Sequence, residues 1–282
     1  MDSIVCVLDD PQTTASILRA GQLLSDRLHD PEVRALHSRP LHDPSFMPTE
    51  EVMTEERLQL CSEREDARTY QIEQQQADRS ASFQEVEGDF CEIIVAAARD
   101  AVLVVVGSPD GSHGRDHVKV SKIIRSLLAG PSAPVIVVPE TSSALIAERI
   151  AIAWKRGTRL DISRNPIMAL LLESTELHVL VPDDDPENEE DLEACIRAVK
   201  QRGVLVTIHR LVLNGRHAGR VTIDAATRDR CDLLVMFEDI HSWLEAMVFG
   251  SSEQDVLNHQ KLPVLLANSS VSPRQRRHPP ES

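Results

Sequence analysis

Two loops of this chain contain residues that could hold a phosphate group. The first lies in "VVVGSPDGSHGRDHVKVSK", where Gly107 and Gly111 directly follow an apolar run. Glycine lets the backbone approach a phosphate closely, so that its N–H groups can bind the oxygens. Lys122, at the end of this stretch, offers a positive charge. The alternative is a solvated turn, because Gly, Ser, Pro and Asp are all common in turns.

The second loop lies in "VMFEDIHSWLEAMVFGSS" (Val235–Ser252) and ends in Gly250 and Ser251. Its beginning is unsuited to a phosphate. Phe237 puts a large ring where the backbone would have to approach, and Ile240 is β-branched and strongly disfavours positive φ. The two residues after Phe237 are acidic and would repel an anion. The pattern therefore predicts that this loop does not bind a nucleotide.

Other patterns that could do chemistry are incomplete. His113 and His117 have an i, i+4 spacing that suits a metal on a helix, but Gly114 between them indicates a loop. The five cysteines include no C-x-x-C pair, and no serine lies in a G-x-S-x-G turn. The acidic run "VPDDDPENEEDLE" lacks the spacing and the central glycine of a calcium loop. We therefore predict no catalytic residue and no metal site.

Short apolar runs alternate with helical spacers, in the same order in each half of the chain. The halves open with "SIVCVLDD" and "RIAIAWKRG", continue with "AVLVVVGS" and "CDLLVMFE", and close with "APVIVVPE" and "LPVLLANS". Such runs are typical of parallel strands buried on both faces. The spacer "EEDLEACIRAVKQRG" reads as an amphipathic helix that ends at Gly203. Counting five strands and about four helices per half, we predict doubly wound α/β sheets with right-handed crossovers.

Four features recur around these runs. Asp9 follows the first strand, "VEGD" (Val86–Asp89) leads into a helix, a glycine loop follows the fourth strand, and Pro134 and Pro263 each precede a valine at a fifth strand. In combination they resemble a tandem universal stress protein, and the resemblance covers both halves. It implies two flavodoxin-like domains of the adenine nucleotide alpha hydrolase-like type, each with a five-stranded parallel sheet in the order 3-2-1-4-5.

In nucleotide-binding members of that family, the acidic residue contacts the adenine or ribose and a G-x2-G-x9-G-[ST] loop holds the phosphates. The matching positions of the first half are Asp9, Gly107, Gly111, Ser121 and Lys122. This loop departs from the pattern twice, because three residues separate its first two glycines and Ser-Lys replaces the final Gly-Ser. Only part of the nucleotide site is therefore expected in the first half.

The second half departs further from the family pattern. Lys155 stands at the acidic position, and Phe237 and Ile240 stand at loop glycines. Only Gly250 and Ser251 match, as a remnant of the loop. The resemblance therefore implies that the nucleotide site of this half has been lost.

Composition limits the classes of partner. The net charge of −15 argues against binding to nucleic acid or to an anionic membrane, since like charges repel. No apolar run approaches the length of a membrane helix. The odd number of cysteines suggests no disulfide framework, and the start "MDSIVCVLDD" does not resemble a signal peptide. A cytoplasmic location is expected.

We expect four segments: a first domain over 1–139, a linker over 140–148, a second domain over 149–270 and a disordered tail over 271–282. The polar stretch Met47–Ser80 has few apolar residues, Ile72 among them, and is expected to be a solvated helix lying across the domain. The alternative is a helix that docks a partner. The resemblance implies that the two halves form an intramolecular pseudo-dimer through their fifth strands, which covers otherwise exposed sheet edges.

The resemblance and the incomplete site together predict a non-catalytic, bacterial-type stress-response protein. It would regulate through contacts with a protein partner and would need no cofactor. The first alternative is a sensor that binds ATP or a related adenine nucleotide weakly, through the first half only. The second is a slow ATP hydrolase or a phosphotransfer protein. Either would need a general base and a metal-binding site, and the sequence shows neither.

Overall fold

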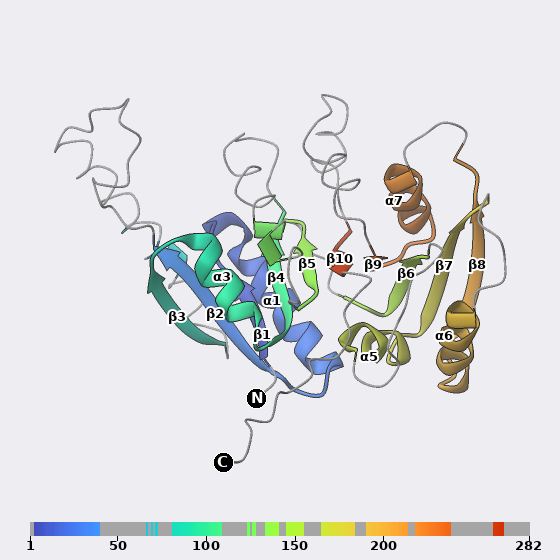
Figure 1. The fold of residues 1–282 in the computed structure, drawn as a ribbon, viewed down its shortest axis with the longest axis horizontal. Helices are drawn as coiled ribbons and strands as arrows, with labels where there is room; N and C mark the ends of the chain where they lie inside the picture. Colours follow the sequence, from blue (N-terminus) through green and yellow to red (C-terminus); the bar gives the residue numbers. More distant parts are fainter. Residues whose placement is uncertain are drawn as a thin grey trace, which may run out of the picture.

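The computed structural model describes residues 3–39, 66, 69, 71–72, 81–108, 123–124, 126–127, 133–140, 145–154, 165–183, 190–213, 218–237 and 262–267. Ten strands in these segments form one sheet in the order β3-β2-β1-β4-β5-β10-β9-β6-β7-β8 (Figure 1). The first half supplies β1 Ser3–Val7, β2 Glu32–Arg39, β3 Ser82–Glu87, β4 Ala101–Gly107 and β5 Val135–Val138. The second supplies β6 Arg149–Ala153, β7 Glu176–Pro182, β8 Leu205–Leu211, β9 Leu233–Phe237 and β10 Val264–Ala267. Each half therefore has the predicted order 3-2-1-4-5.

The helices whose bounds lie within the described segments cover both faces of the sheet. They are α1 Pro11–Arg27, α3 Phe90–Ala98, α5 Pro166–Leu172, α6 Glu190–Gln201 and α7 Ala218–Arg228. Side chains of α1, α5 and α6 belong to the apolar cluster on one face, and those of α3 and α7 to the cluster on the other. No helix in the described part of the chain is long and apolar enough to cross a bilayer.

Capping residues mark the ends of three of these helices. The carboxylate of Asp10 accepts a hydrogen bond from the N–H of Gln12 at 2.9 Å and so caps α1. Asp89 caps α3 in the same way. Gly203, just after α6, has a φ of +86°, which glycine adopts without steric cost.

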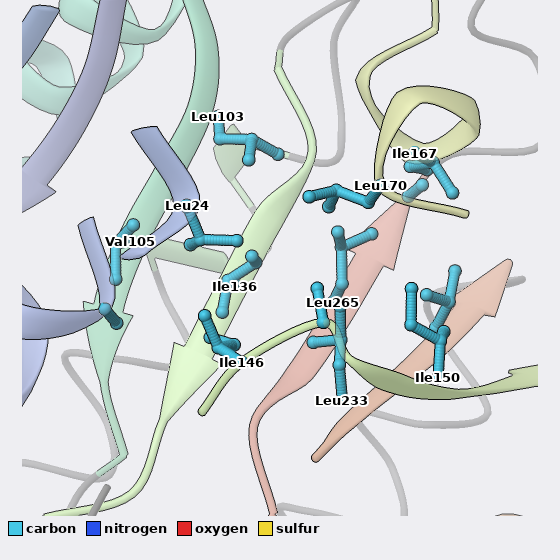
Figure 2. Close-up of a cluster of buried hydrophobic side chains, with 14 of the residues drawn as sticks. Leu24, Leu103, Val105, Ile136, Ile146, Ile150, Ile167, Leu170, Leu233 and Leu265 are labelled. Carbon is cyan, nitrogen blue, oxygen red and sulfur yellow. The ribbon is translucent and has the colours of Figure 1, made fainter. Parts of the chain in front are cut away.

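The core is aliphatic and continuous between the halves. Along β1, Ile4 and Cys6 belong to the cluster on the α1 face, and Val5 and Val7 to the cluster on the opposite face. The cluster on the α1 face extends across both halves of the sheet, as the labelled side chains in Figure 2 show. The central strands β1, β4, β5, β6, β9 and β10 are buried on both faces and are apolar runs in the sequence, whereas the edge strands β3 and β8 are largely exposed.

The halves meet at β5 and β10, the two fifth strands. These pair antiparallel, with Leu265 opposite Ile136, whereas every other neighbouring pair in the sheet is parallel. The predicted contact between the fifth strands is therefore present within one chain. The end of the expected linker is also packed, since Ile146 and Ala147 are buried in the core.

Arg27, at the end of α1, ties the first half to the second. Its guanidinium donates to the backbone carbonyl of Glu173 at 2.9 Å and lies 2.8 Å from Oε1 of Glu148. We expect Arg27→Ala to lower the free energy of unfolding by about 1 kcal/mol, because the pair is partly exposed to solvent. Denaturant unfolding checks this against Arg19→Ala, which removes an exposed arginine from the same helix. Equal losses in the two variants would contradict a specific role for Arg27.

The expectation of a solvated helix over Met47–Ser80 is correct in part at its described residues. Asp66, Thr69, Gln71 and Ile72 are helical, and Asp66 and Gln71 are exposed, but the other two are not. Ile72 is fully buried and belongs to the core cluster on the α1 face. Thr69, three residues earlier, is also buried, and its hydroxyl lies 3.1 Å from Nε2 of the buried His37. A few buried residues one turn apart are enough where a segment adds to an existing core, which a count of apolar residues does not reveal. The rest of this stretch lies outside the described residues.

Candidate functional site

The candidate site of the first half lies where the strand order reverses, at the carboxyl ends of β1 and β4. Val7 pairs with Leu36 in β2, and Cys6 with Val105 in β4. If the same register continues past the strand ends, Asp9 lies opposite Ser38 after β1–β2 pairing and opposite Ser108 just after β4. The structure thus brings Asp9 and Gly107 to the same end of the sheet. The other predicted positions, Gly111, Ser121 and Lys122, lie outside the described residues.

Gly107 lies directly against the first turn of α1. A Cβ built on Gly107 would lie 2.7 Å from Oγ1 of Thr13 and 2.8 Å from its Cβ, closer than side-chain atoms approach one another. Among the described glycines only Gly88 and Gly203 have positive φ, so Gly107 is needed for space and not for backbone conformation. Packing of α1 therefore accounts for this glycine, and a role in phosphate binding stays a prediction.

Two buried hydroxyls flank this end of the sheet. Ser38 and Ser108 are each only 5% exposed, and their Oγ atoms have no hydrogen-bond partner within the described part of the chain. The backbone N–H of Ser108 is already engaged, since it donates to the carbonyl of Val138 at 2.6 Å. An unpaired buried hydroxyl costs about 1–3 kcal/mol, which a polar ligand at this edge would recover.

His37 is buried in β2 beside the crevice, and both of its ring nitrogens lie near partners. Nδ1 lies 2.7 Å from the carbonyl of Leu8, and Nε2 lies 3.1 Å from the hydroxyl of Thr69. A carbonyl only accepts, so Nδ1 carries the proton and Nε2 accepts from the hydroxyl. This ring fixes the segment around Thr69 over the strand ends. The only signal in the sequence is a polar residue inside the run "EVRALHSR".

Two aromatic rings occupy the equivalent place in the second half. Phe237 pairs with Ala267 at the end of β10, as Gly107 pairs with Val138 at the end of β5. The N–H of Trp154 donates to Leu180 as that of Leu8 donates to Leu36, so Trp154 is the counterpart of Leu8.

The two rings pack edge to face, with centroids 6.3 Å apart and an interplanar angle of 68°. Trp154 is 2% exposed and Phe237 is 3% exposed, so the carboxyl ends of β6 and β9 are filled by side chains. The sequence predicted this for Phe237 and missed Trp154. The remaining second-half positions, Lys155, Ile240, Gly250 and Ser251, lie outside the described residues.

Three of the described cysteines have thiols that are not reactive at neutral pH. Burial raises the pKa of Cys6 to about 12, that of Cys195 to about 11 and that of Cys231 to about 12. These thiols stay protonated at neutral pH and are poor nucleophiles. The prediction that Cys6 and Cys231 are small core residues is confirmed by their burial.

Comparison with known proteins identifies the fold and the family. Residues 1–139 and 168–268 each match the model of the Universal stress protein family. The chain belongs to the universal stress protein family. The first matched segment contains strands β1 to β5 and the second contains β7 to β10, so the predicted tandem arrangement of this universal stress protein is confirmed.

Solved structures of low sequence identity share the fold of this universal stress protein. A universal stress protein from Archaeoglobus fulgidus DSM 4304 is 13% identical with a TM-score of 0.63, covering 95% of this chain and 96% of that one. A putative universal stress protein from Pseudomonas aeruginosa UCBPP-PA14 is 14% identical with a TM-score of 0.50, covering 95% of this chain and 93% of that one. No curated protein matches the chain.

Proposed function

We propose that this universal stress protein is a non-catalytic cytoplasmic regulator that acts in the stress response through contacts with a protein partner. Its second half binds no nucleotide. The observation that supports this proposal is the packed pair Trp154 and Phe237, which fills the place where a nucleotide would lie in that half. A polyphosphate needs bare backbone at this position, whereas Phe237 places a buried ring there.

A second candidate function is binding of an adenine nucleotide by the first half alone. It is favoured by the unpaired hydroxyls of Ser38 and Ser108. In the strand register these residues lie opposite Asp9, at the carboxyl ends of the strands where the strand order reverses. A ribose or phosphate at this edge would find two buried groups ready to form hydrogen bonds. The first half thus lacks the two rings, since Leu8 and Gly107 stand at their places, and it has two unpaired hydroxyls at the same end of the sheet.

A titration with ATP and Mg²⁺, followed by thermal unfolding, separates the two functions. If the protein is a regulator that binds no nucleotide, millimolar ATP does not stabilise it against thermal unfolding. A first-half sensor is stabilised by about 2.7 kcal/mol when ATP is at one hundred times its Kd. In the sensor, Asp9→Ala removes the stabilisation, whereas Lys155→Ala, at the matching position of the second half, does not.

Ser108→Ala supplies an independent check on the same site. Without a ligand, removal of an unpaired buried hydroxyl is expected to leave stability unchanged or to raise it slightly. In a sensor, the same change weakens ATP binding. Stabilisation by ATP that survives Asp9→Ala, or ATP turnover above the buffer background, would contradict the proposed function.

A further inference from the structure

Three side chains that can bind a metal meet on the α7 face of the second half. They are His178 in β7, His209 in β8 and Asp229 directly after α7. One ligand atom from each lies within 4.8 Å of the others. We propose that these three residues form a binding site for a divalent transition-metal ion, with zinc as the ion that the ligand set suits. Two imidazoles, one carboxylate and a water make up a common tetrahedral zinc site.

The distances between the ligand atoms agree with a shared ion. Nδ1 of His178 lies 3.0 Å from Nε2 of His209, and that nitrogen lies 3.5 Å from Oδ2 of Asp229. Ligands about 2.1 Å from a tetrahedral zinc lie about 3.4 Å from one another. The remaining pair of ligand atoms lies within 4.8 Å, so side-chain rotations would bring all three atoms to this separation.

Glu176 orients the first of these imidazoles. Its Oε2 lies 3.4 Å from Nε2 of His178 and accepts a hydrogen bond from Arg149 at 2.7 Å. An ionised carboxylate only accepts, so Nε2 of His178 carries the proton, and the lone pair on Nδ1 points into the cluster. A carboxylate behind a histidine is the arrangement found around metal-binding imidazoles.

The simplest arrangement without a metal leaves the contact between His209 and Asp229 without a hydrogen bond, although the Asp229 carboxylate accepts hydrogen bonds from Arg228. Since Nδ1 of His178 is an acceptor, Nε2 of His209 would donate its proton to it across the 3.0 Å contact. Oδ2 of Asp229 lies 3.5 Å from this same Nε2 of His209. The single proton of that nitrogen points to His178, so it forms no hydrogen bond with Asp229. A cation between the three atoms satisfies both nitrogen lone pairs and the carboxylate together.

An ion can reach this cluster from solvent. The side chain of His209 is 22% exposed, that of Asp229 is 17% exposed, and that of His178 is 10% exposed. A groove of about 600 Å³ between β8 and α7 is lined by His209 and by Arg228, which also hydrogen-bonds Asp229. Solvent in the groove supplies the fourth ligand, and the site is therefore open on one side.

The cluster is separate from the filled crevice. Leu177 and Val179 belong to the apolar cluster that also contains Trp154 and Phe237. His178 lies between them in β7, so its side chain points to the opposite face, toward α7. The proposed metal site thus does not depend on whether either half binds a nucleotide.

Zinc binding is measured on the full chain, freed of metal with a chelator, by competition with a chromogenic zinc indicator. Two variants each remove one histidine. His209→Asn removes a ligand, and His29→Asn removes an exposed histidine whose positive φ of 65° asparagine tolerates. We expect the wild type and His29→Asn to bind one zinc ion equally, and His209→Asn to bind it more than about tenfold more weakly.

Asp229→Asn, read by cobalt absorption, tests the third ligand independently. The wild type is expected to show the bands of tetrahedral cobalt with nitrogen and oxygen ligands, and Asp229→Asn to lose or shift them. Circular dichroism of the metal-free variants confirms that each is folded. Equal zinc affinity of His209→Asn and His29→Asn would overturn the site, and so would a sulfur-to-cobalt charge-transfer band, which would assign the ion to cysteine.

Discussion

Replacing Phe237 with alanine is expected to lower the free energy of unfolding by about 3–5 kcal/mol. The ring is 3% exposed and meets Trp154 edge to face, with the centroids 6.3 Å apart. Its removal leaves a cavity at the end of β9, which is held on both sides by β6 and β10 and cannot close around it. The shift of the midpoint in denaturant unfolding, at an unchanged m-value, measures the loss.

Phe237→Leu is the matched control for this prediction. It keeps most of the buried volume and is expected to cost less than about 1.5 kcal/mol. Trp154 is the reporter, because its fluorescence changes when its neighbouring ring is removed and its surroundings become less tightly packed. A loss below about 1 kcal/mol in Phe237→Ala would mean that the crevice of the second half is not filled as the structure shows.

The sheet was predictable from sequence because its central strands are buried on both faces. Runs such as "AVLVVV" are apolar at every position, and their repetition in each half indicates two equivalent sheets. The pairing of β5 with β10 followed from the resemblance and from the need to cover apolar edges. The buried Ile72 was not predictable, because its burial depends on where the segment lies in space and not on its composition.

The candidate sites depend on contacts that sequence spacing does not record. Phe237 was recognisable because it replaces a glycine in a known pattern, whereas Trp154 needed the strand register to be placed beside it. His178, His209 and Asp229 come from two strands and the end of a helix, and no short motif joins them. The expectation of no metal site rested on local motifs alone, and such motifs cannot detect residues that only the sheet brings together.

Gly107→Ala is expected to lower the free energy of unfolding by about 1–3 kcal/mol through overpacking. The new Cβ would lie 2.7 Å from Oγ1 and 2.8 Å from Cβ of Thr13. Thr13 is in the first turn of α1, whose start is fixed by the capping side chain of Asp10, so the backbone there cannot move away freely. Thermal and denaturant unfolding both measure the loss.

A double-mutant cycle with Thr13→Gly identifies the cause of that loss. Thr13→Gly removes the three atoms nearest to the added methyl group, so Gly107→Ala should then cost only a few tenths of a kcal/mol. The difference between the two backgrounds is the steric term between the first turn of α1 and the end of β4. If Gly107→Ala costs the same in both backgrounds, helix packing is not the reason for the glycine. The backbone approach of a ligand then becomes the better explanation for Gly107, and the first half is favoured as a nucleotide sensor.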